Sequence, residues 1–167
     1  MENTYGTSFG TDPFRARVLP GHPQEKNTTD LNVLVEQVLQ DLCPASLHSV
    51  IRCDELPVIQ ASRDKMIRTL EYILGFILAH PPARATLFLH LRCEPVATDF
   101  IDMKMAKGEK IFRILIHSNC TADPSDLPED RKNFCAAILS EIRGRMILNT
   151  GSGTGWLFNL EVPGKLK

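Results

Sequence analysis

The sequence lacks the features that mark a nucleic-acid partner, a membrane span or a secretory signal. Its 19 Lys and Arg are balanced by 20 Asp and Glu, so the net charge is −1, and no basic excess points to a polyanion. No run approaches the ~20 apolar residues of a membrane span. The N-terminus has no basic cluster followed by an apolar run. We therefore expect a cytoplasmic protein that binds no nucleic acid and inserts in no membrane.

Cysteine is also sparse and unpatterned. The five cysteines are odd in number, widely spaced and free of any Cys-x-x-Cys motif, which favours reduced thiols over a disulfide framework. Neither the cysteines nor the five histidines have metal-ligand spacing, so we expect no metal site. With 167 residues, 43% of them hydrophobic and 23% charged, the chain can bury a core without covalent staples.

The chain divides by composition. Residues 1–28 are rich in Gly, Pro and polar residues, which predicts a flexible tail or linker, although 14–19 could add an edge strand. Residues 29–163 are expected to form one domain. We expect 164–167 to be a second short tail.

Two spacings of apolar residues predict the secondary structure of 29–163: every three to four residues in helices, and every second residue in strands. Thr29 or Asp30 can cap the first helix and Ser62 the second, while Gly144 is placed to end the third. Helices and strands do not alternate strictly, so we expect an α+β fold, a two-layer α/β sandwich with a mixed, mostly antiparallel sheet and helices on one face. The expected helices are 30–43, 62–80 and 130–143, and the expected strands are 49–54, 85–94, 101–105, 111–117, 145–150 and 156–162. In the last strand, Trp156, Phe158, Leu160 and Val162 are expected to face the core, with Leu157, Asn159 and Glu161 outward.

Three segments, in this order, resemble the ATP-binding domain of sensor histidine kinases, in the GHKL or Bergerat group that includes gyrase and heat-shock-protein-90 ATPases. They are TDLNVLVEQVLQDLCP, ELPVIQASRDKMIRTLEYILGFILAHPP and SEIRGRMILNTGSGTGWLFNLEVP. The last contains a Gly-x-Gly-Thr turn, made here by Gly151, Gly153 and Thr154, and it is the most specific match. The resemblance covers 29–163 and implies the histidine kinase ATPase-like fold.

The resemblance also implies a nucleotide site, whose parts can be checked against this sequence. The second helix of the family carries two Asn four residues apart that face the phosphates, and the second of them holds Mg²⁺. The matching positions are Tyr72 and Phe76. Magnesium requires oxygen ligands, and a phenyl ring supplies none.

The other parts of that site also depart from the family pattern. The family's adenine-binding Asp-x-Gly-x-Gly turn corresponds to 118–121, where Asn119 is an uncharged hydrogen-bonding group. The family's lid is rich in Gly, but no Gly lies between Gly108 and Gly144. Gly151, Gly153 and Thr154 match, and they serve the turn itself.

These departures predict a non-catalytic, pseudo-ATPase module that regulates or binds proteins in two-component signalling and needs no cofactor. Its expected partner is a response regulator, a kinase dimerisation domain or a second copy of itself. None of the five histidines lies in a phosphoacceptor-type helix, so we expect no autophosphorylation. The alternative is a divergent catalytic domain of a sensor histidine kinase that binds ATP and Mg²⁺.

Tyr72 and Phe76 allow three interpretations. With Arg68, Gly75 and Ala79 they form the helix face opposite the Leu/Ile stripe. Their rings could fill the former ligand cavity, form an apolar surface for another protein, or line a pocket for a less charged ligand.

Overall fold

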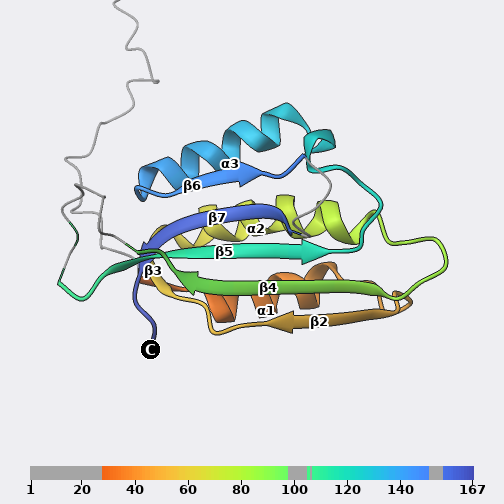
Figure 1. Ribbon diagram of the computed structural model, residues 1–167, viewed down its shortest axis with the longest axis horizontal. Helices are drawn as coiled ribbons and strands as arrows, with labels where there is room; N and C mark the ends of the chain where they lie inside the picture. Colours follow the sequence, from red (N-terminus) through yellow and green to blue (C-terminus); the bar gives the residue numbers. More distant parts are fainter. Residues whose placement is uncertain (1–27, 98–104, 106, 151–155) are drawn as a thin grey trace, which may run out of the picture.

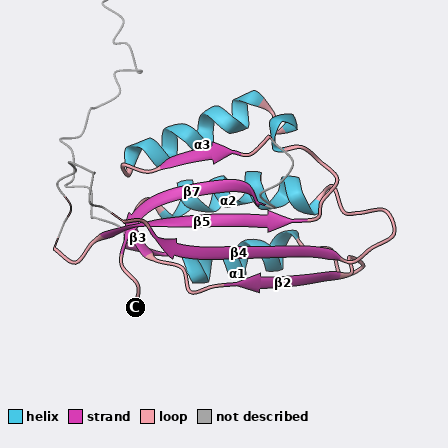
Figure 2. Ribbon diagram, in the orientation of Figure 1, coloured by secondary structure: helices cyan, strands magenta, loops and turns pink. Residues whose placement is uncertain are grey.

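The computed structural model describes residues 28–97, 105, 107–150 and 156–167, which form two layers (Figure 1). A five-stranded sheet has the order β2-β4-β5-β7-β6. Its β2–β4 pair is parallel and the other three pairs are antiparallel. Figure 2 shows the helices on one side of this sheet, so the expected α+β two-layer sandwich is confirmed. The strands are β2 Ser49–Cys53, β4 Leu87–Pro95, β5 Lys110–Ser118, β6 Arg145–Leu148 and β7 Trp156–Gly164.

All three expected helices are present, with ends within two residues of the expected ones. They are α1 Leu31–Leu42, α2 Arg63–Leu78 and α3 Glu129–Glu141, preceded by a short 3₁₀ turn, η1 Pro124–Asp126. Asp30 caps α1, because its carboxylate accepts a hydrogen bond from the Asn32 N–H at 3.0 Å. The middle helix α2 contacts both α1 and α3. It therefore buries residues on more than one face, unlike the one-sided α1.

A second, two-stranded sheet was not expected from the sequence. β1 Thr28–Asp30 pairs antiparallel with β3 Val58–Gln60. Val58 also exchanges two backbone hydrogen bonds with Lys165, of 2.8 and 3.0 Å. A Cβ on Gly164 would lie 2.7 Å from the Val58 carbonyl oxygen, so only glycine permits this approach. The expectation of a single sheet was therefore wrong. Of the expected tail at 164–167, Gly164 ends β7 and Lys165 pairs with Val58.

The last strand β7 also differs from its expected alternation. Its register with β5 shifts between Ile116 and His117, so Trp156 lies opposite His117 and it is Leu157 that packs against the core. A bulge of this kind adds one residue and reverses the faces beyond it. Phe158, Leu160 and Val162 are buried as expected. The outward-facing Asn159 and Glu161 are nevertheless only 5% and 7% exposed.

Gly144 follows α3 but does not supply its left-handed residue. That conformation belongs to Arg143, at φ 63°. A Cβ on Gly144 would clash with the Glu161 carbonyl oxygen. Glycine is required here because the chain passes close to β7. The expectation that Gly144 serves to end α3 is corrected accordingly.

Several expectations lie outside the described residues. They are the tail up to residue 27, the possible strand at 14–19 and most of the strand at 101–105. Among the described residues, no helix is both long enough and apolar enough to cross a membrane.

Candidate functional site

Phe76, which stands where the resemblance implies a magnesium ligand, is part of the hydrophobic core. It is 6% exposed. Its ring makes an edge-to-face contact with Phe158 of β7, with ring centroids 6.3 Å apart, and lies 5.0 Å from the His80 ring. Such contacts add to the apolar burial of the ring. The space on this side of α2 is therefore occupied by an aromatic side chain that offers no oxygen to a cation.

Tyr72, one turn earlier on α2, is half-buried between α2 and α3. Its ring contacts the Phe134 ring edge-to-face, with centroids 5.5 Å apart. The guanidinium carbon of Arg131 lies 5.1 Å from the Tyr72 ring centroid, a cation–π arrangement. Tyr72 thus holds α3 against α2. Together with the burial of Phe76, this favours the filled cavity over an exposed docking surface.

Asn119, at the expected adenine-binding turn, already has backbone partners for its amide. Its Oδ1 accepts a hydrogen bond from the Phe88 N–H at 2.7 Å, and its Nδ2 donates to the Thr86 carbonyl at 3.0 Å. Both partners belong to the start of β4 and the residue before it. The side chain extends the β4–β5 pairing beyond Ser118, so it has a structural role at this edge.

The segment 119–128, which the resemblance places at the family's lid, is fastened to the residues after α2 and to α3. Thr121 donates its N–H to the His80 carbonyl at 2.9 Å. Lys132 of α3 donates to the Ser125 carbonyl at 2.6 Å. Leu127 is 1% exposed. A segment with this many anchors is an integral part of the fold rather than a lid that opens.

The turn of η1 is set by a carboxylate. Asp123 accepts a hydrogen bond from the Ser125 N–H at 2.8 Å. Hydrogen bonds from Ser125, through its side chain and its backbone, hold the pKa of Asp123 below its ordinary value. Asp123 thereby fixes the backbone that leads to the buried Leu127.

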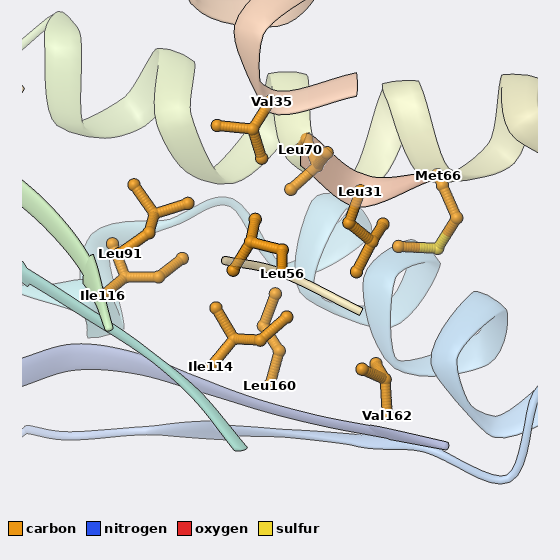
Figure 3. A pocket seen from close by; sticks show the side chains of 10 residues that line it. All are labelled: Leu31, Val35, Leu56, Met66, Leu70, Leu91, Ile114, Ile116, Leu160 and Val162. Carbon is orange, nitrogen blue, oxygen red and sulfur yellow. The ribbon is translucent and has the colours of Figure 1, made fainter. Parts of the chain in front are cut away.

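The described residues do not fit the family's way of holding a magnesium nucleotide. Phe76 lacks a ligand atom, and the amide of Asn119 is already hydrogen-bonded to the backbone. The enclosed cavity in Figure 3 lies elsewhere, between α1, α2 and the sheet, and measures about 10 Å³. Its lining is entirely apolar, so even one water molecule would find no partner there. The three remaining candidates, Gly151, Gly153 and Thr154, lie outside the described residues.

His80 is a site residue that the sequence did not single out. Its Nδ1–H donates to the Phe76 carbonyl at 2.7 Å, its ring packs on Phe76, and its carbonyl accepts from Thr121. It joins the end of α2 to the segment after β5. Because its partners include two backbone groups, no residue pattern in the sequence could have identified it.

Polar groups elsewhere form pairwise contacts rather than a catalytic arrangement. On the helix-free face of the sheet, His90 Nε2 lies 3.0 Å from Asp54 Oδ1. Hydrogen bonds from His90 and from the Cys93 backbone lower the pKa of Asp54. Among the described residues, no three His, Cys, Asp or Glu side chains are grouped as they would be around a metal ion.

Comparison with solved structures identifies the fold. The histidine kinase domain of the blue-light activated kinase EL346 from Erythrobacter litoralis matches with a TM-score of 0.52 and 14% identity, over 80% of this chain and 58% of that one. The mycobacterial sensor histidine kinase MprB matches with a TM-score of 0.55 and 8% identity, over 84% of this chain and 100% of that one. The catalytic domain of the histidine kinase ThkA matches with a TM-score of 0.52 and 13% identity, over 85% and 97%.

These structures share their fold with this chain, which therefore has the fold of histidine kinase ATPase domains. The chain spans less than two thirds of the Erythrobacter domain, all of the MprB structure and nearly all of the ThkA domain. No family model matches the sequence, and no curated protein matches it.

Proposed function

We propose that this domain is a non-catalytic member of the histidine kinase ATPase type, which acts in two-component signalling by binding another protein. The observation that carries the proposal is Phe76, whose buried ring stands where the family holds Mg²⁺ through an asparagine oxygen. Asn119 supports it, because its amide is hydrogen-bonded to β4 and its neighbour.

The proposed partner is a response regulator, a kinase dimerisation domain or a second copy of the chain. Such a module acts in the cytoplasm and needs neither nucleotide nor metal. The support is the fold, which solved histidine kinases share, combined with a nucleotide position filled by Phe76 and by the anchored segment 119–128.

A divergent ATP-binding catalytic domain is the second candidate function. The likeness to a structure described as the catalytic domain of ThkA favours it. In that case ATP and Mg²⁺ would be the cofactors, and their ligands would have to differ from the family's two asparagines.

Calorimetric titration with Mg-ATP separates the two functions. We expect no binding by the natural protein and none by Phe76→Asn, because one restored amide supplies neither the adenine-binding carboxylate nor the glycine-rich lid. A ligand at 100 times its dissociation constant would stabilise the fold by about 2.7 kcal/mol, so thermal unfolding provides an independent reading. Micromolar binding by the natural protein would reject the non-catalytic function and support the second candidate.

A further inference from the structure

Among the described residues, the strand β2 lies at a free edge of the five-stranded sheet, as Figure 1 shows. In the part of the chain that the structure describes, its only strand partner is β4. All five of its residues are partly or fully exposed. An edge of this kind presents unpaired N–H and C=O groups to any strand that can align with it.

Two hydrogen bonds show which residues of β2 face that free edge. Leu87 N–H donates to the His48 carbonyl, and Asp54 N–H donates to the Leu91 carbonyl, both at 2.9 Å. A parallel ladder uses alternate residues of a strand, so the even-numbered residues of β2 turn their backbone groups toward β4. The residues that turn theirs toward the free edge are Ser49, Ile51 and Cys53.

We propose that two copies of this chain pair through β2, antiparallel, about a two-fold axis at Ile51. Ser49 then lies opposite Cys53 of the second copy, and Ile51 lies opposite its own equivalent. Each of the three pairs exchanges two backbone hydrogen bonds, which makes about six in all. The interface is isologous, because both copies contribute the same strand.

The side chains on the helix-free face fit this register. Val50, 47% exposed, and Arg52 point to that face, since they are the register partners of Phe88 and His90. In the dimer each Val50 lies beside Arg52 of the second copy, whose aliphatic stem can cover it. The charges of the two arginines are thus kept from facing each other directly.

Other symmetric registers fit less well. An axis at Arg52 would place the two guanidinium groups directly opposite each other, which destabilises a strand pair. An axis at Val50 would extend the pairing into Leu47, which precedes the strand. The strand from 49 to 53 contains no proline or bulge of the kind that protects other edges, and its one charged residue, Arg52, lies opposite Val50 in the proposed register. With the axis at Ile51, all five residues of β2 pair with the second copy, and no two like charges lie opposite each other.

Sedimentation equilibrium of the full chain tests this pairing, with matched lysine substitutions. We expect a reversible monomer–dimer equilibrium between about 1 and about 500 µM. Val50→Lys puts a lysine opposite Arg52 twice per dimer, and should weaken association on the order of tenfold or more. Val33→Lys is the control, because Val33 is 52% exposed on α1. Both side chains are exposed, so we expect both variants to fold, which circular dichroism checks.

A charge exchange tests the register itself. In Val50→Lys combined with Arg52→Glu, each lysine lies opposite a glutamate, and we expect association to recover. A monomer at all concentrations, equal weakening by Val33→Lys, or no recovery in the double variant would overturn the proposed pairing.

The pairing deepens the protein-binding part of the proposed function and rests on it, but the two can fail separately. A monomer that binds no Mg-ATP would reject the pairing alone. A dimer that binds Mg-ATP at micromolar concentration would reject the non-catalytic function alone.

Discussion

Replacing Phe76 by asparagine introduces the residue that the resemblance implies at this position, and we expect it to destabilise the fold. The ring is 6% exposed and contacts Phe158 and His80. Truncating a buried Phe costs about 3–5 kcal/mol, and an amide left without a partner costs about 1–3 kcal/mol more if no water reaches it. For a chain of 167 residues, a loss of 3–5 kcal/mol lowers the midpoint of thermal unfolding by roughly 6–20 °C.

Urea unfolding followed by circular dichroism measures this loss. Phe88→Asn is the control, because Phe88 is 37% exposed on the open face of the sheet and should lose less than about 1 kcal/mol. A loss below about 1 kcal/mol for Phe76→Asn, or equal losses for the two variants, would refute the filled-cavity interpretation.

Two further predictions concern the outward face of β7. Asn159→Val should stabilise the fold by about 1 kcal/mol in urea unfolding, because Asn159 Oδ1 is buried and has no hydrogen-bond partner among the described residues; destabilisation would contradict this. Burial opposes ionisation of Glu161, but hydrogen bonds from Arg145 and Arg113 outweigh it and hold its pKa below the ordinary value. The stability that this carboxylate contributes is therefore present above about pH 4.3, the unfolded value, and is lost as pH falls through the lower folded pKa. Glu161→Gln should cost about 1–3 kcal/mol at pH 7 and flatten the acid limb of a stability–pH profile, and an unchanged acid limb would contradict it.

The parts of the fold that follow from long periodic patterns were predictable. The stripe of α1 and its cap at Asp30 are local features, and each needs only neighbouring residues to form. The two-stranded sheet was not predictable in this way. β1 and β3 contain three residues each, too few for an alternation to be recognised, and their pairing spans the whole of α1.

The candidate site was also predictable only where a feature depends on the residue itself and its neighbours. The absence of a magnesium ligand at Phe76 can be read from the residue itself. The role of Asn119 cannot, because its partners are backbone groups 31 and 33 residues away whose positions depend on the complete sheet. The prediction that Trp156 faces the core was wrong, because one bulge residue reverses an otherwise regular alternation of side chains.

If Phe76 and the segment 119–128 fill the position of the family's nucleotide, Mg-ATP finds no site beside α2. Amide and aromatic NMR spectra of the labelled protein with and without about 5 mM Mg-ATP test it most directly, with Asn119, Thr121 and the rings of Phe76 and Phe158 as reporters. We predict no saturable shift at these reporters, since a concentration of this size would fill any site of micromolar affinity. A saturable shift confined to these residues would show that a nucleotide enters beside α2, and would contradict the account.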